Sequence, residues 1–153
     1  MGSPREIVIR SLDNIKRAAL DSMIFIYHLE DRRPQSDATT ALFETGERAK
    51  IRFSTSVLTL TEVLTGYRKM RDQKSESAFF EMVRQMSSAL EVIPMDGAIA
   101  DYAATLRAKY RLRTPDAIHF ATASVSGAEV YITNDRKLKS VKDLPVLLLS
   151  ELV

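Results

Sequence analysis

The sequence predicts an α/β fold in which a mainly parallel sheet lies between two layers of helices. Short apolar runs alternate along the chain with longer segments in which apolar residues recur every three or four positions. This alternation of strands and helices is typical of parallel, three-layer α/β/α folds. The length of 153 residues and the hydrophobic content of 45% fit one globular domain with a buried core.

The expected strands are short segments rich in apolar and β-branched residues, each bounded by polar or turn-forming positions. Their ranges are 18–20, 51–54, 90–94, 130–135 and 145–149. Segment 5–16 mixes apolar and charged residues and is compatible with a short strand or with a helical arm. Segment 31–37, which contains Pro34, is expected to be a loop.

Helices are expected between these strands. One opens at or just after Asp21, and another covers 38–50, although Gly46 leaves its end open. Thr55 or Ser56 is expected to cap a third helix. The later helices are marked by the following periodic positions and caps: Phe79, Met82, Val83, Met86 and Leu90; the Asp96 cap with Ile99, Ala103, Leu106 and Tyr110; and the Thr114 cap with Pro115.

Composition excludes several classes of protein. Without cysteine the chain has no disulfide, thiolate zinc site or cysteine nucleophile, and a cytoplasmic location is expected. Segment 117–128 is the longest without a charged residue and is far shorter than the roughly 20 residues that span a membrane, so no membrane association is expected. The net charge of +2 does not by itself indicate a polyanionic partner. Glycine-rich phosphate-binding motifs are absent, which disfavours dinucleotide and P-loop functions.

Four acidic residues are expected at one edge of the sheet. Asp21 follows the first central strand, Asp135 ends another, and Asp116 lies in the first turn of a helix. Glu62 lies about two turns into its helix, but helical side chains lean toward the N-terminus and can reach back. The carboxyl edge of a parallel sheet is where such folds bind ligands.

Four carboxylates in one notch repel one another. Two unit charges about 5 Å apart repel by roughly 3 kcal/mol at an effective dielectric constant of about 20. Either some carboxylates are protonated or a cation lies among them, and Mg²⁺ or Mn²⁺ is the cation that oxygen ligands favour. Such a site can hold a phosphodiester, activate a water molecule and stabilise charge on the phosphate.

Four motifs in register resemble those of the PIN-domain ribonucleases, specifically the VapC toxins of bacterial and archaeal toxin–antitoxin pairs. The resemblance runs from about Ala18 to the C-terminus in the family's order and spacing. Residues 18–153 are therefore expected to form a PIN-like nuclease domain, and residues 1–17 an N-terminal extension with a candidate tag remnant at 1–3. The motifs are Asp21-Ser22 with Ile26-Tyr27, Thr61-Glu62-Val63, Thr114-Pro115-Asp116-Ala117-Ile118-His119 with Ala121-Thr122-Ala123, and Thr133-Asn134-Asp135.

The resemblance implies a PIN-like three-layer fold, Mg²⁺- or Mn²⁺-dependent endonucleolytic cleavage of RNA, a homodimer, and inhibition by a cognate antitoxin in a type II pair. It assigns the catalytic roles to acids and two supporting roles to neighbouring polar residues. The metal ligands would be Asp21, Asp116 and Asp135. The catalytic set is Asp21, Glu62, Asp116 and Asp135, with Ser22 and Asn134 in support. The long segment before Asp21 departs from the family's pattern.

Alternatives remain open for individual residues and for the function. Arg113 and Arg136 flank the acids in sequence and are expected to bind RNA phosphates, or else to form a solvated charged face. His119 lies one turn after Asp116, where it would contact substrate, support the site, or pack in the core. The alternative function is a catalytically silent PIN-fold module that binds RNA or protein. A phosphatase is disfavoured because no D-x-D pattern follows the first strand.

Overall fold

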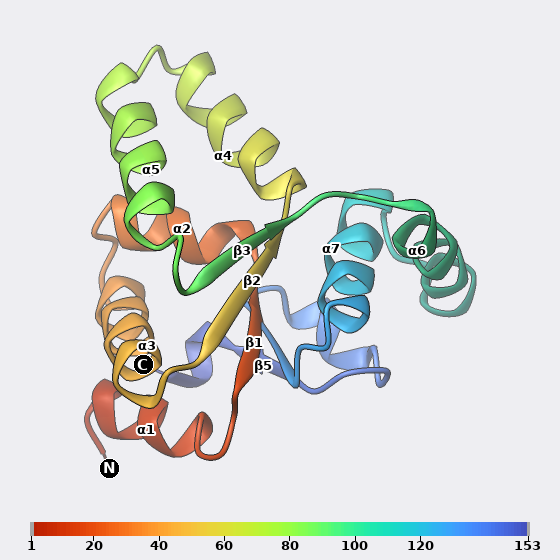
Figure 1. Cartoon of the computed structure of the whole chain (residues 1–153), viewed down its shortest axis with the longest axis horizontal. Helices are drawn as coiled ribbons and strands as arrows, with labels where there is room; N and C mark the ends of the chain where they lie inside the picture. Colours follow the sequence, from red (N-terminus) through yellow and green to blue (C-terminus); the bar gives the residue numbers. More distant parts are fainter. Residues whose placement is uncertain (1, 153) are drawn as a thin grey trace.

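The computed structural model describes residues 2–152, which fold around a sheet of five strands with parallel pairing throughout. The strands are β1 (Arg17–Leu20), β2 (Arg52–Ser56), β3 (Leu90–Ile93), β4 (Val130–Thr133) and β5 (Val146–Leu148). Their order across the sheet is β3-β2-β1-β4-β5, so β1 and β4 are central neighbours. Helices cover both faces (Figure 1). The predicted three-layer α/β/α fold is therefore confirmed.

The helices form two groups, one on each face of the sheet. The first group is α1 (Pro4–Ser11), α2 (Ser22–Leu29), α3 (Gln35–Ala49), α4 (Leu58–Lys69) and α5 (Gln73–Gln85). The second is α6 (Gly97–Tyr110) and α7 (Thr114–Val125). Two short 3-10 helices complete the chain, η1 (Arg136–Ser140) and η2 (Leu149–Leu152). No helix within residues 2–152 is long and apolar enough to cross a membrane.

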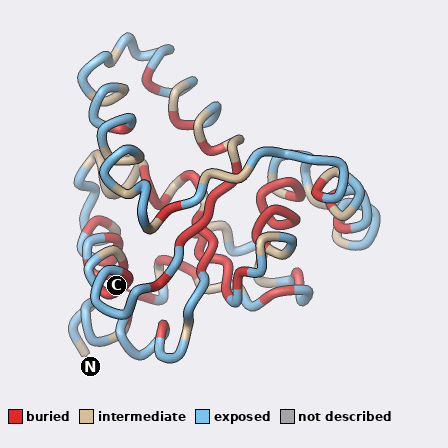
Figure 2. The backbone as a smooth tube through the Cα atoms, viewed as in Figure 1, coloured by how far each residue is buried: buried red, intermediate tan, exposed pale blue. Residues whose placement is uncertain are grey.

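The two central strands supply both halves of the core, because successive side chains of a strand point to opposite faces. Leu20 and Ile132 pack with the first group of helices, whereas Ala19 and Tyr131 pack with α6 and α7. Figure 2 shows residues 18–20 and 130–133 of these strands, and residues 117–123 of α7, as buried segments. The sheet and α7 therefore form a rigid base for the residues at the strand ends.

The N-terminal segment is helical, as one of its two predicted alternatives proposed. Ser3 caps α1 in a capping box with Glu6. Val8 is fully buried, and it packs in the same core cluster as Leu149 and Leu152. Helix α1 thus joins the beginning of the described chain to its end on one face of the sheet.

Several predicted boundaries are wrong by a few residues. Helix α3 begins at Gln35, inside the expected loop. Of the two predicted caps, Thr55 belongs to β2, and its hydroxyl donates to the backbone oxygen of Leu20 at 2.8 Å and so ties two strands together. Ser56 ends β2, and its hydroxyl accepts from the backbone N–H of Leu58, the first residue of α4, at 3.1 Å. At the start of α7, Arg113 occupies the cap position that was predicted for Thr114. The hydrogen bond of Thr55 to a neighbouring strand is a contact that sequence periodicity does not contain.

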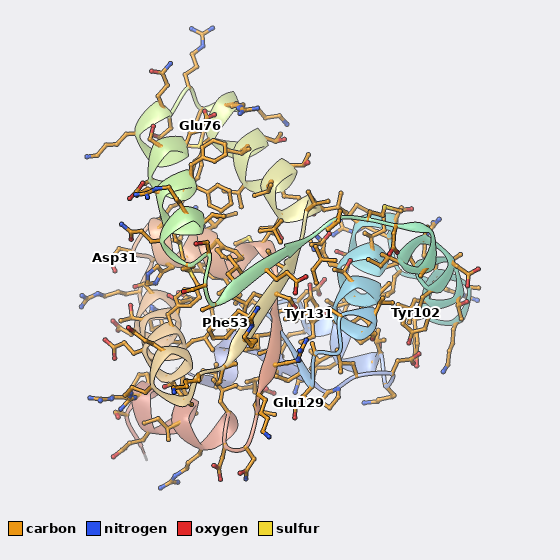
Figure 3. All side chains as sticks on the ribbon, in the orientation of Figure 1. Asp31, Phe53, Glu76, Tyr102, Glu129 and Tyr131 are labelled. Atoms are coloured by element: carbon orange, nitrogen blue, oxygen red, sulfur yellow. The ribbon has the colours of Figure 1, made fainter. Side chains whose placement is uncertain are left out.

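Gly46 lies inside α3 because the aromatic ring of Phe53 leaves no room for a side chain. A Cβ at this position would lie 2.3 and 2.5 Å from two ring atoms of Phe53, which is labelled on β2 in Figure 3. We expect Gly46→Ala to lower the free energy of unfolding by about 1 kcal/mol, because overpacking costs more than the helix propensity gained. Denaturant unfolding measures this change.

Gly66 provides the matched control for this prediction. It also lies inside a helix, but a Cβ there would meet nothing within 4 Å. Gly66→Ala is expected to raise the free energy of unfolding by about 0.5–1 kcal/mol through helix propensity alone. An equal gain in Gly46→Ala would contradict the steric role of Phe53.

Asp143 anchors the segment after η1 to helix α6. Its two carboxylate oxygens accept hydrogen bonds from the hydroxyls of Tyr102 and Tyr110, each at 2.6 Å. These two hydrogen bonds hold the pKa of Asp143 below its usual value of 3.8. A carboxyl group with a lowered folded pKa stabilises the fold above its ordinary pKa, and this stability is lost as the pH falls through the folded value.

We expect Asp143→Asn to be less stable than the wild type at pH 7, with a difference that shrinks as the pH falls below about 4. The reason is that protonation removes from the wild type the same charged acceptor that the substitution removes. Chemical unfolding of both proteins between pH 7 and pH 3 tests this expectation. A difference that stays constant over this range would assign the effect to packing.

Candidate metal centre

The topology brings the ends of two central strands to the same edge of the sheet. Strands β1 and β4 are parallel neighbours, with Leu20 paired to Ile132. Asp21 follows β1, and its backbone N–H donates to Ile132 at 3.0 Å. Asp135 follows β4 by two residues. The predicted convergence of these two acids at the carboxyl edge therefore follows from the pairing of their strands.

Asp21 occupies the cap position of α2, but its side chain does not cap the helix. One carboxylate oxygen instead accepts from the hydroxyl of Thr133 at 2.5 Å. The hydroxyl of Ser22 lies 3.2 Å from the other oxygen of Asp21 and 2.5 Å from Oε2 of Glu62. The buried Ser22 thus bridges Asp21, which precedes α2, and Glu62, which lies on α4.

Glu62 reaches this edge from α4, as the backward lean of helical side chains predicted. Its Oε1 lies 2.8 Å from Nε2 of His119, a residue of α7 whose side chain is 4% exposed. A carboxylate only accepts hydrogen bonds, so the imidazole N–H donates. Potential ligand atoms of Asp21, Glu62 and His119 all lie within 4.8 Å of one another.

The pair of Glu62 and His119 favours its charged form. Burial alone would raise the pKa of Glu62, but hydrogen bonds from His119 and Ser22 and the nearby charges of His119 and Arg113 outweigh it, so that the pKa is lowered. Burial alone would lower the pKa of His119, but its hydrogen bond with Glu62 and the charges of Glu62, Asp21 and Asp116 raise it. The histidine thus offsets part of the negative charge.

Asp116 and Asp135 lie beside this cluster and line a pocket of about 170 Å³. We call the region of the four acids the acidic notch. Asp116, in the first turn of α7, accepts from Nε of Arg113 at 2.9 Å. Asp135 accepts from the backbone N–H of Lys137 at 3.0 Å. The backbone N–H of Asp135 in turn donates to the hydroxyl of Thr133 at 3.1 Å. Thr133 therefore connects Asp135 to Asp21.

All four acids lie close enough to Tyr131 of β4 for their charges to act on it. Burial raises the pKa of Tyr131, and the negative charges of the four acids raise it further. Tyr131 lies within the core, on the face covered by α6 and α7 (Figure 3). Within residues 2–152, the compact group of ligand atoms holds Asp21 and Glu62 but not Asp116 or Asp135. The structure thus brings two acids into one cluster and places the other two beside it.

The remaining predicted site residues have different surroundings. The amide of Asn134 donates to the hydroxyl of Tyr27 at 3.3 Å and accepts from the backbone N–H of Ser150 at 3.1 Å, so it holds the end of β4 to its neighbours. Arg113 is highly exposed beside Asp116. Arg136 is exposed at the start of η1.

Two residues of the site were not assigned to it by the sequence. Thr133 is fully buried and joins Asp21 to Asp135. Its sequence signals were its place at the end of a strand and in the motif Thr133-Asn134-Asp135, but neither assigned it a role. For His119, the spacing of one turn from Asp116 left support of the site and core packing both open. In the structure both hold, because the ring of His119 is buried and its Nε2 donates a hydrogen bond to Glu62.

The residues present fit a hard divalent cation. Oxygen atoms of Asp21 and Glu62 already lie close together, and two further carboxylates line the adjoining pocket. Mg²⁺ and Mn²⁺ prefer carboxylate oxygens, whereas imidazole nitrogen suits softer metals such as zinc and copper. The crowding of carboxylates is also what a cation would relieve.

The family model of the PIN domain matches residues 18–144, which is most of the chain. The chain belongs to the PIN-domain family. The match includes all four acids, Ser22 and His119. A search of curated protein sequences found no match.

Several solved structures that resemble this PIN domain come from toxin–antitoxin complexes. A chain of VapBC2 from Rickettsia felis, bound to a DNA fragment from their promoter, is 20% identical with a TM-score of 0.72, and the match covers 86% of this chain and 98% of that one. A chain of a toxin–antitoxin complex from Klebsiella pneumoniae is 27% identical, with a TM-score of 0.60 and coverages of 86% and 97%. A chain of VapBC-5 from Mycobacterium tuberculosis is 23% identical, with a TM-score of 0.59 and coverages of 87% and 97%.

Proposed function

We propose that this PIN domain is a Mg²⁺- or Mn²⁺-dependent endoribonuclease and the VapC-type toxin of a type II toxin–antitoxin pair. The observation that carries the proposal is the cluster of Asp21 and Glu62, bridged by Ser22, with Asp116 and Asp135 around the same strand end. Membership of the PIN-domain family and the solved toxin–antitoxin neighbours support it.

In this proposal Asp21, Asp116 and Asp135 hold the cation, and Glu62 completes the set of oxygen ligands or orients the attacking water. A bound Mg²⁺ or Mn²⁺ would activate water and neutralise charge on the phosphate. Ser22 and His119 keep Glu62 ionised and fixed in direction. Thr133 fixes the carboxylate of Asp21. These buried donors reduce the reorganisation that the acids need during the reaction.

The RNA backbone is proposed to lie along the pocket beside Asp116 and Asp135. Cations line this pocket at Arg111, Arg113 and Lys137, and phosphates are the groups of RNA that such side chains bind. The predicted role of Arg113 in substrate binding therefore remains a proposal with a defined place. Arg136, predicted for the same role, lies outside the lining of this pocket.

We expect Arg111→Gln and Lys137→Gln each to raise KM for RNA several-fold while kcat stays near the wild-type value. Each substitution removes one phosphate contact, so the slope of log affinity against log salt concentration should fall by about 0.7 for single-stranded RNA. Steady-state cleavage at several salt concentrations measures both effects. Arg52→Gln, at the opposite edge of the sheet, serves as the control for lost positive charge. If Arg52→Gln had an equal effect, the loss would reflect overall charge, and the pocket would not be the binding site of the RNA backbone.

The decisive test of the proposed activity is incubation of structured RNA with the protein and Mn²⁺, with and without a chelator. Fragments that disappear with the chelator support the nuclease. An Asp21→Asn protein purified in parallel must fail to produce them, which excludes a contaminating ribonuclease. RNA that is bound but stays intact would favour the alternative, a catalytically silent module that binds RNA or protein.

The proposed partners are a cognate antitoxin and a second copy of the chain in a homodimer. The acidic notch is complementary to a cationic side chain, so we propose that an antitoxin inserts an arginine or lysine there. Co-expression with the product of the neighbouring gene, followed by measurement of mass and inhibition, tests both partners. Inhibition that survives removal of every arginine and lysine from the antitoxin segment in the notch would contradict this mode of binding.

A further inference from the structure

His119 is buried beside the acids of the notch. It lies on α7, whose residues from Ala117 to Ala123 are all buried between the sheet and α6. Its side chain is 4% exposed, and its Nε2 points to Oε1 of Glu62 at 2.8 Å. A ring held on the most buried helix of the domain is a rigid donor.

Glu62 has the opposite character. Its side chain is 38% exposed, and it extends from α4, a helix that packs on the other face of the sheet. A free glutamate of this length has several rotamers, and fixing one of them costs conformational entropy. The hydrogen bond from His119 therefore joins the two helical layers across the edge of the sheet and restrains the more mobile partner.

We propose that His119 is a positioning residue for the nuclease, which holds Oε1 of Glu62 so that the carboxylate faces Asp21. Ser22 completes the restraint at Oε2, at 2.5 Å, and it also lies 3.2 Å from Asp21. Both oxygens of Glu62 are thus fixed by buried donors before any cation binds. This inference rests on the proposed function, because the position of Glu62 matters only if the acids bind a cation.

The same geometry argues against His119 as a direct ligand of the cation. Its Nε2 already donates to Glu62, and a protonated ring nitrogen has no lone pair to offer a metal. Mg²⁺ and Mn²⁺ also prefer the oxygens that surround the ring. Outer groups that orient ligating carboxylates typically change metal affinity or activity by about 10–100-fold when they are removed.

The test compares His119→Ala, which has no donor, with His119→Gln, whose side-chain amide can donate to Glu62. We expect His119→Ala to weaken Mn²⁺ binding, measured by calorimetry, and RNA cleavage by about 10–100-fold, and His119→Gln to recover most of both. The double variant with both Glu62→Ala and His119→Ala should bind Mn²⁺ as weakly as Glu62→Ala alone, because His119 acts through Glu62. His28→Gln, which changes a histidine bonded to Thr39 away from the acids, should leave both readouts at the wild-type value.

Two further measurements keep this inference separate from the proposed function. Unfolding in the presence of a chelator should show that the changes in Tm caused by His119→Ala and Glu62→Ala are not additive, and this measurement requires no metal. Additive changes, together with a failure of His119→Gln to restore Mn²⁺ binding in a folded protein, would reduce His119 to a packing residue. If magnetic resonance shows a coupling between a histidine nitrogen and bound Mn²⁺, and His119→Gln removes this coupling, then His119 is a ligand of the metal and the proposal is overturned. If the wild type neither binds Mn²⁺ nor cleaves RNA, the proposed function fails, while the metal-free coupling still decides whether His119 and Glu62 act as a pair.

Discussion

Asp21→Asn is expected to reduce RNA cleavage by at least about 10²-fold, the scale on which single groups that stabilise a transition state contribute. Asparagine has the same shape and can still accept from Thr133, so the fold should remain intact. It removes one of the two carboxylates of the cluster, and with it the charge that a divalent cation needs. Single-turnover cleavage at saturating Mn²⁺ measures the effect. Asp116→Asn should act in the same direction.

The same substitution, Asp21→Asn, should raise the stability of the metal-free protein although it lowers RNA cleavage. Without metal, Asp21 and Glu62 repel each other, and removal of one charge is expected to raise the free energy of unfolding by about 1 kcal/mol. Asp101→Asn removes an exposed acid on α6 and should leave both cleavage and stability near the wild-type values. A folded Asp21→Asn protein that binds Mn²⁺ and cuts RNA at the wild-type rate would show that the site has been assigned to the wrong residues.

Addition of Mg²⁺ or Mn²⁺ to the chelator-treated protein is expected to stabilise it strongly. A ligand that binds only the folded state at about 100 times its Kd adds about 2.7 kcal/mol. For a domain of this size that corresponds to roughly 5–10 °C in Tm. The physical reason is that the cation replaces repulsion among four carboxylates by attraction to each of them. Two samples are compared by thermal unfolding. One contains 5 mM chelator, and the other contains free metal at a concentration on the order of 100 times Kd.

The controls for this shift are a monovalent salt and a variant. An equal ionic strength of KCl screens the exposed charges without coordinating them, so it should give a much smaller change. The Asp21→Asn protein should respond weakly to Mn²⁺, because its set of oxygen ligands is incomplete. An unchanged Tm in the wild type with either divalent cation would contradict the metal site, whatever the RNA assays give.

The path of the two central strands was predictable because it depends on short segments of sequence. Segment 18–20 is apolar and is followed by Asp21, and segment 130–135 begins with an apolar, β-branched run and ends at Asp135. Since parallel strands end at a common edge, the proximity of Asp21 and Asp135 follows once the two strands are neighbours. The helical lean toward the N-terminus was enough to bring Glu62 to the same place.

The contacts of the site were not predictable in the same way. Glu62 and His119 are 57 positions apart and come from helices on opposite faces of the sheet. The periodicity around His119 is the same whether the ring packs in the core or donates to an acid. Asn134 is another example, because the resemblance gave it a supporting role but not the contacts of its amide with Tyr27 and Ser150.

The sequence by itself determined the alternation of strands and helices, the absence of cysteine chemistry and the set of acids at the strand ends, because these depend on local periodicity and residue type. Only the tertiary structure decided that His119 donates to Glu62, that Ser22 bridges Glu62 and Asp21, and that Phe53 requires glycine at position 46. The physical reason is that a hydrogen bond or a steric contact depends on a few ångströms between distant segments, and hydrophobic periodicity places a residue on a face but not within that distance.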